Sequence, residues 1–208
     1  MQGQWRLFVS ALTFALSTLF AVTPSSTARA GEGEGLSLAD LAGSYAGRQG
    51  GFLTLCLTSD FSSDAACEHP SSVAVQFNDT EVLQGTFSPD GKFCLTDTDV
   101  NSPVGGSKAP ATVIDFVAAG SITSYNRKTG RGTTSFTLYR HTAENPVSCK
   151  GANLVKSEGV QEDSHGTQDF TVGEEPALHI DSVITSLTAV HGAYGGFVVS
   201  ATLYIQHQ

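Results

Sequence analysis

Hydrophobic and polar residues alternate along the chain in short runs, and these runs come in pairs on either side of turn sequences. One pair covers residues 82–96 and turns at 89–91, where Asp-Gly tolerates the positive φ that a tight hairpin requires. Similar pairs cover residues 120–140 and 179–206. Three hairpins of one kind predict an antiparallel sheet whose apolar face must be covered.

Shorter signals place the remaining elements. We expect one helical turn at 36–42, strands at 43–47, 52–57, 73–77 and 112–118, and turns at Gly50-Gly51 and at residues 78–80. A Gly/Pro-rich linker is expected at 101–110, and a long polar loop at 141–168.

No segment after residue 30 sustains the 3.6-residue apolar period of a long helix. About nine or ten short strands joined by hairpins leave a choice between a β-sandwich and an up-and-down barrel. A meander that closes has no exposed edge strands. The sequence therefore predicts an all-β protein, an antiparallel up-and-down meander closing into a single barrel, with a β-sandwich as the alternative.

The first 30 residues have the pattern of a cleaved secretory signal peptide. Arg6 precedes an apolar run at 7–22, and Ala28-Arg29-Ala30 fits the small-residue cleavage rule. The run is short for a membrane-spanning helix, which needs about 20 residues. Residues 31–208 are then expected to form one exported barrel domain, secreted or periplasmic, without a membrane span.

Removal of Arg6 and Arg29 with the signal takes the formal net charge from −9 to −11. Nucleic-acid binding requires Lys and Arg to replace counterions, so this balance argues against a nucleic-acid partner. It also disfavours adsorption to anionic lipid. The oligomeric state is left open.

Four cysteines lie in the expected mature chain, and an even number in an exported protein predicts two disulfides. We favour Cys56 with Cys67, as a local bridge, and Cys94 with Cys149, joining a hairpin strand to a later loop. No C-x-x-C motif occurs, so a redox or zinc-ribbon role has little support.

The segment 38–45 (LADLAGSY), the following hairpins with Asp-Gly or Gly-x-Gly tips, and a last strand ending in Gln resemble exported lipocalin-like, calycin-type β-barrel proteins of unassigned function. The lipocalin opening Gly-x-Trp corresponds here to Gly43-Ser44-Tyr45, with Tyr in place of Trp. The resemblance implies an exported β-barrel and leaves its function unassigned. Dirigent and allene oxide cyclase-like barrels share the same general pattern.

No catalytic residue, cofactor site or metal site is assigned from the sequence. His179 and Asp181 share a strand face, and with His165 and His191 they form a conceivable metal set, but ordinary surface histidines explain the pattern better. Asp115 alternates with valines on a strand. It would be a candidate acid or base if it faced a cavity, but an outward position is favoured.

The expected inward set is apolar: Phe77, Phe87, Phe116, Phe136, Phe197 and Leu203. In an eight-stranded barrel such a lining would suit one small hydrophobic molecule, or would simply fill the core. A ligand-binding barrel is our first hypothesis. A cell-exterior structural or interaction protein acting through its loops is the second, and a cyclase- or isomerase-type enzyme using Asp115, Tyr45 or Tyr125 is the third.

Overall fold

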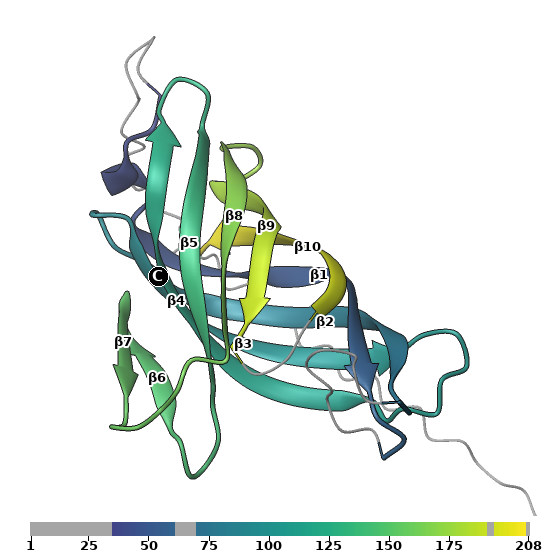
Figure 1. The fold of residues 1–208 in the computed structure, drawn as a ribbon. Coiled ribbons are helices and arrows are strands. Elements are labelled where there is room, and N and C mark those ends of the chain that lie inside the picture. Colours follow the sequence, from purple (N-terminus) through teal and green to yellow (C-terminus); the bar gives the residue numbers. More distant parts are fainter. Residues whose placement is uncertain (1–34, 61–69, 191–193, 207–208) are drawn as a thin grey trace, which may run out of the picture.

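The computed structural model describes residues 35–60, 70–190 and 194–206 (Figure 1). The expected signal peptide, residues 1–30, lies outside this part of the chain. The described part contains one 3₁₀ helix and ten strands: η1 (Leu38–Leu41), β1 (Gly43–Leu57), β2 (Val73–Phe87), β3 (Lys92–Pro103), β4 (Thr112–Asn126), β5 (Arg131–Arg140), β6 (Val147–Lys150), β7 (Asn153–Lys156), β8 (Ser164–Gly173), β9 (His179–Ala189) and β10 (Tyr194–Ile205).

Eight of these strands close into an antiparallel barrel in the order β1-β10-β9-β8-β5-β4-β3-β2. Every barrel strand pairs with its sequence neighbour, except that the β6–β7 hairpin is inserted between β5 and β8. β1 and β10 pair along most of their length and complete the closure. The predicted all-β fold and up-and-down meander are confirmed, and the sandwich alternative is wrong. No helix in the described residues has the length and apolar character needed to cross a membrane.

Two predicted turns are wrong because the chain continues through them as strand. Gly50 pairs with Ser200 on one side and with Thr80 on the other, within the uninterrupted β1. Asp79 is likewise paired on both sides, with Gly51 and Asn101, within the uninterrupted β2. Hydrogen bonding to two neighbouring strands outweighs the turn preference of these residues. The expected linker at 101–110 also begins in strand, because β3 extends to Pro103.

The predicted long loop at 141–168 is also wrong in part. It contains the β6–β7 hairpin and the first half of β8, a barrel strand with Gly166 on its inner face. A Cβ at Gly166 would lie 2.8 Å from the ring of Phe136, which occupies the space that a larger inner residue would need. The strand therefore lacks the apolar alternation that would have revealed it.

One end of the barrel is closed by η1 and a cluster of aromatic side chains. Ser37 and Asp40 form a capping box that fixes η1, which falls within the expected helical turn. The buried Tyr45 hydroxyl donates a hydrogen bond to the Leu41 carbonyl at 2.9 Å and so ties β1 to η1. Phe87 lies between Tyr45 and Phe93, with ring centroids 5.1 and 5.0 Å away.

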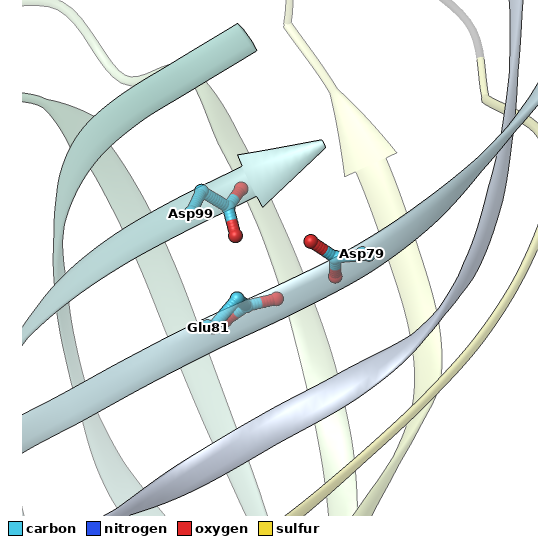
Figure 2. A group of neighbouring side chains, drawn as sticks. All are labelled: Asp79, Glu81 and Asp99. Carbon is cyan, nitrogen blue, oxygen red and sulfur yellow. The ribbon is translucent and has the colours of Figure 1, made fainter. Parts of the chain in front are cut away.

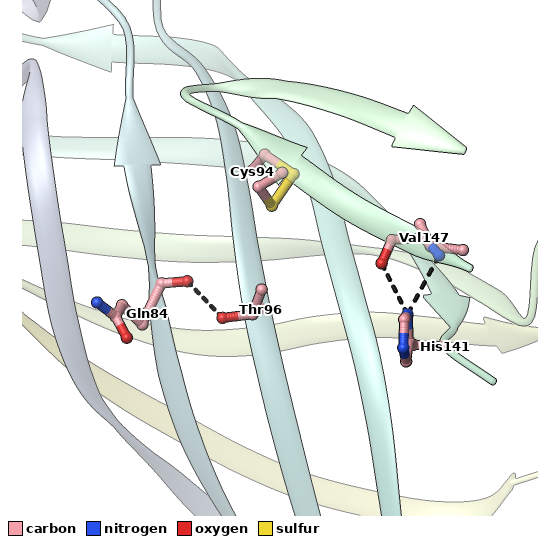
Figure 3. Close-up of a disulfide and its surroundings, with 6 residues drawn as sticks. Gln84, Cys94, Thr96, His141 and Val147 are labelled. Carbon is pink, nitrogen blue, oxygen red and sulfur yellow. Dashed lines mark hydrogen bonds between the residues drawn. A yellow bond between two sulfur atoms is a disulfide. The ribbon is translucent and has the colours of Figure 1, made fainter. Parts of the chain in front are cut away.

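The β6–β7 hairpin packs on the outside of the barrel, where Val117 and Val147 are buried with Cys94. Cys94 and Cys149 form the predicted disulfide between β3 and β6 (Figure 3). The Val147 N–H donates to Nδ1 of His141 at 3.2 Å beside this bridge. The other predicted bridge, Cys56–Cys67, involves a residue outside the described part of the chain and stays a prediction.

Candidate functional site

The barrel encloses a cavity of about 470 Å³. Its apolar lining includes side chains from β1, β2, β4, β5 and β10. Four of the six predicted lining residues border it: Phe77, Phe116, Phe136 and Leu203. Phe87 is buried at the closed end against Tyr45, away from this cavity, and the side chain of Phe197 lies outside the described part.

A band of acidic side chains crosses the cavity wall on two neighbouring strands. Asp79 and Glu81 come from β2, and Asp97, Asp99 and Asn101 come from β3. The ladder places Asp79 opposite Asn101 and Glu81 opposite Asp99. Because side chains two apart on a strand share a face, all five project inward. We call these five residues the acidic band.

Four of the five residues of the acidic band are buried. Asp79, Glu81, Asp97 and Asn101 retain only 4, 5, 5 and 6% of their surface accessible. Figure 2 shows Asp79, Glu81 and Asp99 pointing toward one another from the two strands, and one carboxylate oxygen of each lies within 4.8 Å of the others. The expectation of an apolar interior is therefore wrong for this part of the barrel.

Burial and crowding raise the pKa values of Glu81, Asp97 and Asp99. Burial, followed by the neighbouring Asp97, raises the pKa of Glu81 well above its usual value. Burial also raises the pKa of Asp97 to about 6, and burial together with Asp79 and Asp97 raises the pKa of Asp99 to about 9. In the described part of the chain, no Lys, Arg or His forms an ion pair with any of them. Arg140 borders the same cavity.

Few donors satisfy the oxygens of the band. Gln49, opposite Glu81 on β1, donates from Nε2 to Oε2 of Glu81 at 2.7 Å and holds that side chain against the wall. Among the described residues, one oxygen on each of four band side chains is buried without a hydrogen-bond partner: Asp79, Asp97, Asp99 and Asn101. Buried polar atoms are nearly always paired. The band therefore offers acceptor oxygens for a donor or a cation.

The other residues singled out from the sequence lie elsewhere. Asp115 is exposed and accepts a hydrogen bond from the Thr98 hydroxyl at 2.8 Å, so its favoured outward position is confirmed. Tyr45 is buried in the closed-end core, and the partly buried Tyr125 packs against it.

The conceivable histidine site does not assemble in the described residues. Nε2 of His179 lies 3.5 Å from Asp181 Oδ2, but His165 pairs with Glu162 near the opposite end of the β8–β9 ladder. His191 lies outside the described part of the chain.

The sequence did contain a signal for the acidic band. Phe77 and Leu83 are both inner residues of β2, and an unbroken strand between them must point residues 79 and 81 inward as well. The turn predicted at residues 78–80 breaks this alternation, so the sequence prediction did not place residues 79 and 81 on the inner face. The outward valines support the same register, since Val82 is 60% exposed.

Comparisons with known proteins add no relative to this picture. No protein-family model matches the chain, and searches of curated proteins and of solved structures found no match.

Proposed function

We propose that this protein is an exported barrel that binds one small, largely apolar molecule inside the cavity. The observation that carries the proposal is the cavity itself: about 470 Å³ within an eight-stranded barrel whose other end is packed. Ligand sites typically measure about 300–1,000 Å³ and have mostly apolar walls with a few polar groups. An eight-stranded barrel is just wide enough for one such ligand.

The distribution of wall residues indicates how the ligand lies. Leu53, Leu57 and Phe77 form an apolar layer on one side of the acidic band. Leu83, Leu95 and Phe136 form another on the other side. A ligand spanning the cavity would place its apolar body against these layers. Hydrogen-bond donors on the ligand would face the carboxyl oxygens of the band, which accept but do not donate when ionised.

Export is part of the proposal and rests on two supports. The first is the signal-like pattern of residues 1–30, and the second is the Cys94–Cys149 disulfide, which is typical of oxidising compartments. The alternative of an interaction protein predicts a filled core. A cavity of this size favours ligand binding over that alternative.

Two measurements test the proposal. Native mass spectrometry of the protein purified from its own host should detect a co-purifying small molecule. The emptied barrel should bind a neutral apolar dye, N-phenyl-1-naphthylamine, with a rise in fluorescence.

A matched pair of variants locates the dye. Ala118→Phe places a ring in the cavity from β4 and should abolish the fluorescence rise, because Ala118 borders the cavity between Leu95 and Leu138. Val113→Phe puts a ring on the outside of the same strand, at a position 69% exposed, and should leave binding unchanged. Equal binding by both variants, or none by the natural sequence, would contradict the proposal.

A further inference from the structure

We propose that Asp79, Glu81 and Asp99, with the side-chain oxygen of Asn101, form a binding site for a divalent cation of the calcium class on the inner wall of the barrel. This goes beyond ligand binding in the cavity and does not depend on it. The site would lie where β2 and β3 run side by side (Figure 2).

The three carboxylates already converge at a spacing suited to one ion. One oxygen from each lies within 4.8 Å of the other two. Calcium binds oxygen ligands at about 2.3–2.6 Å, so two ligands on opposite sides of the ion are about 5 Å apart. The oxygens need little movement to reach such distances, and the paired strands hold their Cα atoms in place.

A second, independent observation points to a ligand at the same place. Asn101 is a neutral residue, 6% exposed, and no residue in the described part of the chain forms a hydrogen bond with its Oδ1. Its partner across the ladder is Asp79, so the two side chains project from adjacent strands to the same inner face. Burying an amide oxygen without a partner is unfavourable. A cation beside Asp79 would satisfy this oxygen, as well as the unpartnered oxygens of Asp79 and Asp99.

The site is rich in carboxyl groups, and its described surroundings are poor in basic ones. Four carboxyl side chains lie together, and no basic residue of the described chain forms an ion pair with them. Gln49 fixes Glu81 through a 2.7 Å hydrogen bond that engages only Oε2. Gln49 is therefore a positioning residue, which leaves the other carboxylate oxygen of Glu81 available to an ion.

The chemical type of the ligand atoms indicates which cation the site would bind. All of them are oxygens, which are typical of Ca²⁺ and Mg²⁺, while zinc sites favour His and Cys. Mg²⁺ usually keeps several waters and binds only one or two carboxylates. Three carboxylates, an amide oxygen and the nearby Asp97 in one enclosed group fit calcium better.

The test is calcium titration of the signal-free chain after EDTA treatment and dialysis. Isothermal titration calorimetry with CaCl₂ should give one site per chain, and thermal unfolding in about 1 mM CaCl₂ should occur a few degrees higher than in EDTA. MgCl₂ should bind at least about tenfold more weakly.

Variants locate the site. Asp79→Asn and Asp99→Asn keep the side-chain shape but remove a charged ligand, and each should lower calcium affinity by at least about tenfold. Asn101→Ala removes a ligand without changing charge and should also weaken binding. Asp115→Asn, an exposed carboxylate on β4, is the matched control and should bind calcium like the natural sequence.

Three results would overturn the proposal: no binding at about 10 mM CaCl₂, equal affinity in Asp99→Asn and Asp115→Asn, or magnesium binding as tight as calcium. Calcium binding without uptake of the neutral dye would support this site while contradicting the proposed ligand function. Dye uptake without calcium binding would support the proposed ligand function and contradict the calcium site.

Discussion

The closed end and the acidic band lie on the same two strands, but their inner positions are filled differently. At the closed end, the inner positions of β2 and β3 carry Phe87 and Phe93, and the pocket that these rings border measures only about 20 Å³. Farther along the same strands, the inner positions carry Glu81 and Asp99 beside a cavity of about 470 Å³. One end of the barrel wall is packed for stability, and the other retains unpaired polar groups that packing alone would eliminate.

The largest expected effect is at the closed end. Phe87→Ala removes a side chain that is 5% exposed and packed between Tyr45 and Phe93. Because the surrounding strands cannot collapse into the space, the free energy of unfolding should fall by about 3–5 kcal/mol. Urea denaturation followed by circular dichroism would measure it.

Phe52→Ala is the control for this comparison. Phe52 lies on β1 but is 48% exposed, so its truncation should cost less than about 1 kcal/mol. Equal losses for the two variants would mean that the closed end does not carry the stability of the barrel.

The sequence predicted the closed end and the overall fold well, because hairpin tips and period-2 patterns are local signals. The Asp-Gly turn between β2 and β3 is where it was expected, and the alternation of Val199, Ala201 and Leu203 gives the inner face of β10. β8 escaped prediction because its inner positions include Gly166, where the Ser186 carbonyl and the Phe136 ring on the two neighbouring strands leave no room for a side chain. Because this fit involves residues on different strands, the sequence of one strand alone does not reveal it.

The acidic band was missed for a different reason. Residues such as Asn78 and Asp79 have strong turn preferences, and these obscure the alternation of inner and outer residues that runs from Phe77 to Leu83. Convergence of Asp99 with Glu81 depends on the β2–β3 register, which no single segment specifies. Asp79, whose turn preference conflicts with its place in β2, belongs to the candidate site, and such conflicts are expected where function opposes folding.

A second prediction uses pH to test the closed end. Burial and the nearby Tyr125 raise the pKa of Tyr45 to about 12, against about 10 in an unfolded chain. Below pH 10 both states keep the proton, so the stabilisation is complete there. Between pH 10 and 12 the unfolded chain releases the proton first, and stability should fall as pH rises, by about 2 kcal/mol from this group.

Urea denaturation at pH 8 and pH 11 measures about half of that loss, because pH 11 lies midway between the two pKa values, with Tyr45→Phe as the reference. The variant lacks the hydrogen bond to Leu41 and should be about 1 kcal/mol less stable at pH 8. Its further loss at pH 11 should be smaller than that of the natural sequence, because it has no hydroxyl to ionise. Identical losses in the two proteins would show that Tyr45 is not protected by the closed end.

The smallest expected effect is in the acidic band and has the opposite sign. Asp97→Asn removes one carboxyl group from four that are crowded in an enclosed wall, and the new amide can donate to its neighbours. In EDTA the free energy of unfolding should therefore rise by about 1 kcal/mol. Asp115→Asn, on the outside of β4, should change it by less than about 0.5 kcal/mol. A loss of stability in Asp97→Asn would mean that the acidic band stabilises the empty barrel. It would contradict the view that the closed end stabilises the fold while the acidic band destabilises it.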